Sequence, residues 1–175
     1  AQTYRQAEEM HAFDFIQTQK VEGKIHHIGL SFHDKAELLD EILTAHPELE
    51  YVQIQLNYLD WNDPVVESRL CYEVAVKHHK PVIVMEPVKG GSLIQVPAPA
   101  KALFEKAHPD LSTASWAIRF AASPSHVMMV LYGMSDEQQV ADNISYMKDF
   151  HPLDEKEQHV VEQAVKIIRA SEIIQ

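Results

Sequence analysis

The sequence predicts an α/β fold of the (β/α) TIM-barrel type, amounting to about half a barrel. Two observations lead to this class. Four short apolar segments rich in β-branched residues alternate with segments of helical periodicity. Strict alternation of this kind is typical of parallel strands joined by right-handed helical crossovers. Polar residues on one face of the second strand favour the barrel over a small open sheet, because a covering helix would leave them unsatisfied.

The chain is expected to begin with a helix over residues 3–21. Its apolar residues recur three to four positions apart, Thr3 can cap its start, and Gly23 ends it. Residues 25–31 then form the first short strand. A helix over residues 34–45 follows, because its apolar residues again share one side. That side comprises Leu38, Leu39, Ile42 and Leu43.

The second strand, over residues 51–57, alternates between apolar and polar residues, as a half-buried strand does. One side carries Val52, Ile54 and Leu56, and the other carries Gln53, Gln55 and Asn57. The next helix is expected over residues 65–79. Its buried face is expected to comprise Val65, Val66, Leu70, Val74 and Ala75.

The third strand and the loop after it form the most informative stretch. Residues 82–85 are an apolar run too short for a helix, and they predict a strand buried on both faces. Pro87 ends the strand because it has no N–H group. Gly90 and Gly91 leave the backbone free to approach a ligand, and together with Lys89 they suit phosphate binding. A tight loop without a ligand is the alternative.

The remaining elements continue the alternation. Two helices are expected near residues 100–107 and 112–122, the latter capped by Ser112 or Thr113. A strand over residues 127–132 and a helix over about 136–147 complete the fourth unit. A final helix extends to about Ala170, with Val160, Val161, Ala164, Ile167 and Ile168 inside and a solvated acidic face of Asp154, Glu155, Glu157 and Glu162.

Composition excludes several functional classes. The 175 residues suffice for one well-buried domain, and the net charge is -11 without a Lys/Arg cluster, so neither nucleic acid nor a membrane is an expected partner. Cys71 is the single cysteine, which excludes an internal disulfide and fits a cytoplasmic protein. Because the chain lacks an initiator Met, we expect it to be a piece of something longer.

Four sequence motifs around the predicted strand ends resemble those of a known family. The motifs GKIHHIGLSFHD, VQIQLNYLDW, PVIVMEPVKGGSL and the combination of SWAIRFA with YGMSDEQQVADN resemble, in order and spacing, the C-terminal half of an aldo-keto reductase. The resemblance covers nearly all of residues 5–150. It is most similar to the bacterial branch that carries a 4Fe-4S segment after the barrel. The whole chain, residues 1–175, is therefore expected to be one partial (β/α)8 domain.

The resemblance implies a binding site for NADPH or NADH. Ser31 and Gln53 match the residues that hold the nicotinamide carboxamide, and Met85 takes the place of a Tyr or Trp that stacks on the ring. The loop over the pyrophosphate corresponds to Glu86, Val88, Lys89, Gly90 and Gly91. The adenosine end corresponds to Gly133, Met134, Ser135, Asp142 and Asn143. Gln139 stands where many members place an Arg for the 2′-phosphate, which leaves the choice between the two cofactors open.

The resemblance also implies that no catalytic residue lies in this sequence. The Asp, Tyr, Lys and His of the family's tetrad belong to the first four strands, which would precede residue 1. The 4Fe-4S segment would follow residue 175. We therefore expect the chain alone not to reduce its small carbonyl substrate, because it lacks the acid that protonates the alkoxide. The substrate itself is left open.

Other candidate residues have ordinary explanations. No metal site is expected, because the adjacent histidines of His26-His27 and His78-His79 lack a carboxylate at ligand spacing. Cys71 has no evident activating base. Glu86 either has a functional, perturbed carboxyl group or pairs with a Lys or Arg. Trp116 and Arg119 are expected to pack and bridge.

Two other interpretations remain at this point. A non-catalytic half-barrel has two open sheet edges and could form a homodimer that closes an eight-stranded barrel. An unrelated (β/α) enzyme half, or a flavodoxin-like domain, would also show this alternation of elements. The order of the strands separates the flavodoxin-like fold from a barrel half.

Overall fold

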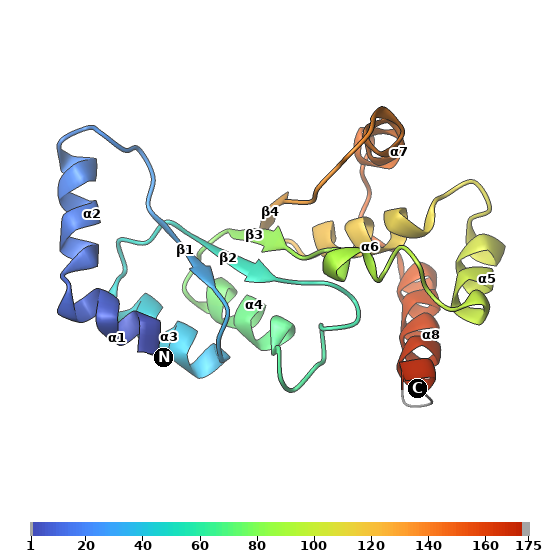
Figure 1. Ribbon diagram of the computed structural model, residues 1–175, viewed down its shortest axis with the longest axis horizontal. Helices are drawn as coiled ribbons and strands as arrows, with labels where there is room; N and C mark the ends of the chain where they lie inside the picture. The colour runs from blue at the N-terminus through green and yellow to red at the C-terminus, as the bar shows by residue number, and fades with distance from the viewer. Residues whose placement is uncertain (1, 173–175) are drawn as a thin grey trace.

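The computed structural model describes residues 2–172 and contains a four-stranded parallel sheet (Figure 1). Its strands are β1 (Gly29–Phe32), β2 (Tyr51–Gln55), β3 (Val82–Met85) and β4 (Val127–Val130). They lie in sequence order, β1-β2-β3-β4, and every neighbouring pair is parallel. The half-barrel prediction is confirmed, whereas the flavodoxin-like alternative is wrong because its sheet departs from sequence order.

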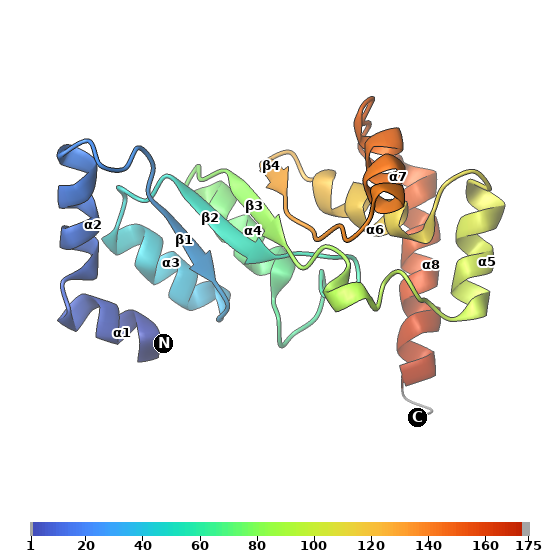
Figure 2. The same ribbon diagram turned by 45° about the horizontal axis from the view of Figure 1, so that its top comes forward.

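Eight α-helices and one short 3₁₀ turn accompany the strands in the described residues. They are α1 (Gln2–Glu9), α2 (Ala12–Val21), α3 (Ala36–Ala45), α4 (Ser68–Lys77), η1 (Lys89–Gly91), α5 (Ala98–Ala107), α6 (Thr113–Ala122), α7 (Glu137–Met147) and α8 (Glu155–Glu172). Figures 1 and 2 show α1 and α2 beyond β1 at one end of the molecule, and α5 and α8 at the other. Within residues 2–172, no helix has both the length and the apolarity to cross a membrane.

The sheet buries one face and leaves the other open. Val52, Ile54, Val82 and Val84 point towards α3 and α4 and are almost completely buried. The opposite face carries half-buried or exposed side chains, including those of Ser31, Gln53, Gln55, Ile83 and Met85. The expectation that β3 is buried on both faces is therefore wrong. The helices cover one face only, and the open face corresponds to the interior of a barrel.

Two helical predictions also need correction. The expected helix over 3–21 is broken, because His11 adopts a left-handed conformation (φ 53°) between α1 and α2. The helix expected over 65–79 begins only at Ser68, because the carboxylate of Asp63 accepts hydrogen bonds from two backbone N–H groups and fixes a preceding turn. Its buried residues are Ser68, Cys71 and Ala75, while Val65 and Leu70 are exposed.

A second apolar cluster joins α5, α6 and α8. Phe104 and Trp116 stack in it with ring centroids 4.8 Å apart. Beside it the buried carboxylate of Glu157 accepts a hydrogen bond of 2.7 Å from Arg119. Trp116 and Arg119 thus pack and bridge as expected. The prediction of a solvated acidic face on α8 is wrong for Glu157, because the side chain of this residue points inward and pairs with Arg119.

Candidate functional site

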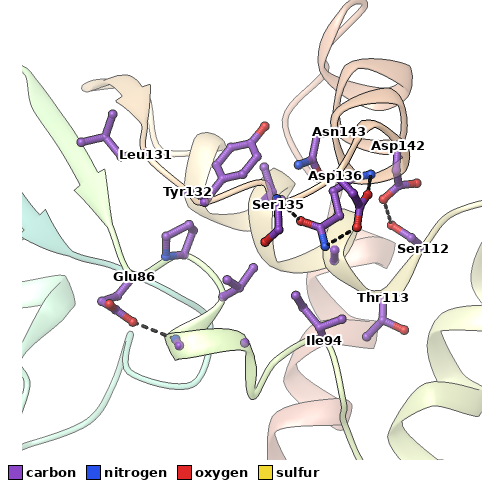
Figure 3. Close-up of a pocket in the computed structure, with 18 of the residues that line it drawn as sticks. Glu86, Ile94, Ser112, Thr113, Leu131, Tyr132, Ser135, Asp136, Asp142 and Asn143 are labelled. Atoms are coloured by element: carbon purple, nitrogen blue, oxygen red, sulfur yellow. Dashed lines mark hydrogen bonds between the residues drawn. The ribbon is translucent and has the colours of Figure 1, made fainter.

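A cavity of about 1120 Å³ lies at the carboxyl ends of β3 and β4 (Figure 3). Its walls come from the turn after β3, the start of α6, the segment after β4 and the start of α7. The carboxyl ends of parallel strands are where α/β proteins place their ligands. The loops that form these walls therefore decide what the cavity can bind.

The turn after β3 has an unusual backbone. Glu86 and Lys89 have positive φ values of 56° and 49°, and Gly90 and Gly91 follow with 61° and 94°. The carboxylate of Glu86 accepts a hydrogen bond of 2.8 Å from the N–H of Gly90. No Lys or Arg among residues 2–172 pairs with Glu86, so the ion-pair alternative is wrong, and the carboxylate instead binds the backbone of its own turn.

Two further backbone donors of this turn are also engaged. The N–H of Lys89 donates to the carbonyl of Glu86 at 3.1 Å, and the N–H of Gly91 donates to the carbonyl of Val88 at 3.0 Å. The glycine N–H groups that the sequence offers for phosphate binding thus already have partners. An anion that binds the N–H group of Gly90 or Gly91 would have to replace one of these hydrogen bonds.

Lys89 is held by a buried carboxylate that the sequence analysis did not single out. The Nζ atom of Lys89 lies 2.7 Å from Oδ1 of Asp60, which is only 2% exposed. The side-chain amides of Gln55 and Asn57 donate to the other oxygen of Asp60 at 2.6 and 2.8 Å. The polar side of the second strand is thus partly structural, because Gln55 and Asn57 fix Asp60 and through it Lys89.

Side chains in and just before α7 cap the N-terminus of this helix. Asp136 caps α7, since its carboxylate accepts a hydrogen bond of 2.8 Å from the N–H of Gln139. The side chain of Gln139 bridges Asp136 and the N–H of Ser135, at 3.1 and 2.8 Å (Figure 3). Gln139 therefore stabilises this turn in place of the arginine that the resemblance would put there.

A second hydrogen-bonded group joins α6 to α7. Ser112 caps α6 by accepting from the N–H of Ser115, and its hydroxyl donates to Asp142 at 2.6 Å. One turn away, the hydroxyl of Tyr146 donates to buried Asn143, and burial raises the pKa of that phenol. The carboxylate of Asp142 and the amide of Asn143, near the middle of α7, therefore line the cavity and are fixed by hydrogen bonds.

The three residues matched to the nicotinamide end meet on the open face of the sheet. The amide nitrogen of Gln53 lies 3.4 Å from the hydroxyl of Ser31 and 3.5 Å from the sulfur of Met85. This proximity follows from the strand register, in which Ser31 pairs with Gln53 and Gln55 with Met85. A donor, an acceptor and a polarisable sulfur thus share one small area of the sheet.

The structure brings most of the expected cofactor residues together. Those that line the cavity are Met85, Glu86, Val88, Gly90, Gly91, Gly133, Ser135, Gln139, Asp142 and Asn143. Ser31 and Gln53 lie next to it through their contacts with Met85. Lys89 and Met134 do not line it, because the former pairs with Asp60 and the latter is exposed at the surface. Further lining residues, which the resemblance did not supply, include Ile94, Lys101, Ser112, Thr113, Tyr132 and Asp136.

Cys71 and the histidines contribute no reactive centre that the structure describes. Cys71 is buried, and burial raises the pKa of its thiol to about 11. Within residues 2–172, no group of three His, Cys, Asp or Glu side chains is arranged to hold a metal ion. The polar groups that line the cavity are thus amides, hydroxyls, carboxylates and the ammonium group of Lys101.

The fold and the cavity define a parallel (β/α) half-barrel with a cavity at its strand ends, and sequence comparison specifies the family. The profile of the Aldo/keto reductase family matches residues 4–166, so this chain belongs to that family. A search among curated proteins gave no match.

Solved structures agree with the fold. An aldo-keto reductase from Bacillus halodurans in its apo form matches with a TM-score of 0.66 and 22% identity, over 85% of this chain and 54% of its own. The glycerol dehydrogenase of Gluconobacter oxydans matches with a TM-score of 0.65 and 18% identity, over 87% of this chain and 53% of its own. An aldo/keto reductase from Klebsiella pneumoniae, solved with NADP and acetate, matches with a TM-score of 0.63 and 16% identity, over 84% of this chain and 50% of its own. The chain thus spans about half the length of these structures.

Proposed function

We propose that this chain is the NAD(P)H-binding half of a cytoplasmic aldo-keto reductase that reduces aldehydes or ketones, and that residues 1–175 form one partial (β/α)8 domain of that enzyme. The observation that carries this proposal is the cavity at the ends of β3 and β4. Ten of the fourteen residues that the family resemblance assigns to the cofactor line it, and Ser31 and Gln53 adjoin it through Met85. The NADP in the Klebsiella pneumoniae structure supports a dinucleotide as the ligand.

The polar groups of the cavity fit the two ends of a dinucleotide, whereas its middle requires a change in the turn after β3. The amide of Gln53 and the hydroxyl of Ser31 match the donor and acceptor needs of a carboxamide, and both are accessible on the open face. Asp142 and Asn143 supply an acceptor and an amide at the other end. In between, Gly90 already has Glu86 as its partner, so binding a pyrophosphate requires a rearrangement of the turn.

A bound dinucleotide would supply the hydride for carbonyl reduction. The residues of this chain would orient its nicotinamide through Ser31 and Gln53 and pack Met85 against the ring. Since these groups supply neither an acid nor a base at the reacting carbon, the protonation of the alkoxide falls to residues outside this sequence. On this proposal the chain alone binds the dinucleotide but does not turn over a carbonyl substrate. The 4Fe-4S segment of the related branch stays a prediction.

Titration of NADH and NADPH against this chain tests the proposal. Nicotinamide fluorescence should change on binding, and Ser31→Ala and Gln53→Ala should each weaken binding by roughly tenfold, the effect of losing about one good hydrogen bond. Ser125→Ala, at the amino end of β4, is the matched control and should leave the affinity unchanged. If neither NADH nor NADPH binds to the chain, the assignment of a dinucleotide site is refuted.

A second candidate function is assembly. The described sheet ends in β1 and β4 without a further strand, and Met128, Met129 and Leu131 at the β4 edge are exposed. Two copies related by a two-fold axis along the barrel would pair each β4 with the partner's β1 and close an eight-stranded barrel. Light scattering tests this homodimer, since a monomer at all concentrations would exclude it.

A further inference from the structure

We propose that the cavity selects a dinucleotide whose adenosine ribose carries a free 2′-hydroxyl, so that this chain prefers NADH to NADPH. The inference rests on the proposed function and goes further, because it decides between two cofactors that differ by one phosphate group. Three features of the cavity carry it: the sign of its charges, the occupation of the α7 N-terminus, and the hydrogen-bonding capacity of its carboxylates.

The charged side chains that line the cavity are mostly acidic. They are Glu86, Asp136 and Asp142, against Lys101 as the single cation among the described lining residues. Lys101 is itself exposed, and its ammonium group lies 3.4 Å from the carboxylate of Glu105. A further phosphate group would add negative charge to a cavity that already carries an excess of it. Sites that hold such a group normally supply an Arg fork or a cluster of cations.

The start of α7 offers no replacement for the missing cation. A helix N-terminus attracts anions through its free N–H groups and its dipole. Here the carboxylate of Asp136 already accepts from the N–H of Gln139, and the carbonyl oxygen of the Gln139 side chain accepts from the N–H of Ser135. A phosphate in this place would lie next to a carboxylate that is covalently tethered to the helix and already occupies one of its N–H donors.

The same carboxylates suit a ribose with free hydroxyl groups. An ionised carboxylate is purely an acceptor, so it can bind hydroxyl donors but repels phosphate oxygens. Dinucleotide sites on α/β folds use an acidic side chain for the 2′-hydroxyl and an Arg for the 2′-phosphate. Asp136 caps the start of α7 and Asp142 lies near its middle; both line the cavity, and the hydroxyl of Ser112 holds Asp142 in place. Both the oxygen and the nitrogen of the Gln139 side chain make hydrogen bonds within the turn.

The decisive experiment compares ADP-ribose with 2′-phospho-ADP-ribose by calorimetry, because these compounds lack the nicotinamide and test the adenosine end alone. We expect ADP-ribose to bind at least about tenfold tighter at low salt, and the difference to shrink as salt screens the carboxylates. Equal or tighter binding of the 2′-phosphorylated compound would overturn this inference while leaving the proposed function standing. Failure of ADP-ribose, NADH and NADPH alike to bind would overturn the proposed function, and this inference with it.

Single variants distinguish the effect of the Asp136 carboxylate on the ligand preference from the effect of the overall negative charge. Asp136→Asn keeps a good helix cap but removes the charge, so the preference for ADP-ribose should fall severalfold. Gln139→Arg should tighten binding of 2′-phospho-ADP-ribose and leave ADP-ribose nearly unchanged. Glu137→Gln, beside Asp136 but outside the cavity lining, is the matched control. An equal effect of Glu137→Gln and Asp136→Asn would contradict a role of Asp136 in the selection.

Discussion

The carboxylate of Glu86 binds the backbone N–H of Gly90 at 2.8 Å and so occupies a donor that a pyrophosphate oxygen would use. The two residues belong to one turn at the end of β3, and Glu86 adopts a left-handed conformation to make the contact. The chain thus places its own anion at the point where its proposed ligand carries negative charge. On the proposed function, we therefore expect ligand binding and the conformation of this turn to be coupled.

Removal of the Glu86 charge should increase the affinity for ADP-ribose. In Glu86→Gln an amide oxygen can still accept from Gly90, but it competes less well with a phosphate oxygen and does not repel it. We expect roughly threefold tighter binding, measured by calorimetry at low salt. Glu73→Gln, which removes a carboxylate from the outer side of α4, should have no effect. Unchanged binding by Glu86→Gln would show that the turn does not oppose the ligand.

Gly91→Ala should destabilise the fold through its backbone alone. Gly91 has a φ of +94°, and a Cβ atom added there would meet no heavy atom within 4 Å. The cost is therefore conformational, about 1–2 kcal/mol of unfolding free energy. Gly133 also has open space but no positive φ, so Gly133→Ala should change stability by less than about 0.5 kcal/mol. Urea unfolding of both variants measures the difference, and equal effects would contradict the strain argument.

Asp60 should matter more for stability than its partner Lys89. Asp60→Ala leaves the amides of Gln55 and Asn57 and the ammonium of Lys89 without their acceptor, at a cost of about 3–5 kcal/mol. Lys89→Met removes one donor, while Asp60 retains two amides, so about 1–3 kcal/mol is expected.

Urea unfolding of both variants tests this order. Lys101→Met is the control, because the pair of Lys101 with Glu105 is exposed and contributes about 0–1 kcal/mol. If Asp60→Ala does not fold, Asp60→Asn gives the same comparison with a milder change. A greater loss in Lys89→Met than in either Asp60 variant would contradict the central place of Asp60.

The features of the fold that the sequence predicts correctly are those that depend on local periodicity. The alternation of Val52 and Ile54 with Gln53 and Gln55 predicts the two faces of β2, because successive side chains of a strand point in opposite directions. The parallel order of the strands follows from the helices between them. The juxtaposition of Ser31 and Gln53 came from the family motifs, and the register of β1 with β2 accounts for it physically.

The missed features depend on contacts between distant segments or on single backbone conformations. Asp60 and Lys89 are 29 residues apart, and their pairing depends on how two loops fold over the same strand ends. Arg119 and Glu157 are 38 residues apart, so the inward turn of Glu157 has no local signal. The break between α1 and α2 depends on the left-handed conformation of His11, which helical periodicity cannot reveal.

His46 should make the stability of the fold depend on pH near neutrality. Its ring stacks on Phe13 of α2 with centroids 3.6 Å apart, and its two nitrogens lie 2.5 Å from Glu8 of α1 and 2.9 Å from Glu48. Burial of the ring lowers the pKa of His46, but the hydrogen bonds to the two carboxylates outweigh burial and leave the pKa raised above its usual 6.5. The protonated ring thus fastens α1 and α2 to the end of α3.

The sign of the effect follows from proton linkage. With a raised pKa, the native state binds more protons than the unfolded state between pH 6.5 and the higher native value. The stabilisation is therefore complete below about pH 6.5 and is lost as the pH rises through the native pKa. His46→Gln should abolish this decline, measured by urea unfolding between about pH 5.5 and 8.5, whereas His159→Gln on the exposed side of α8 should retain it. A decline of the same size in His46→Gln would place its origin elsewhere, since the variant has no group at position 46 that titrates in this range.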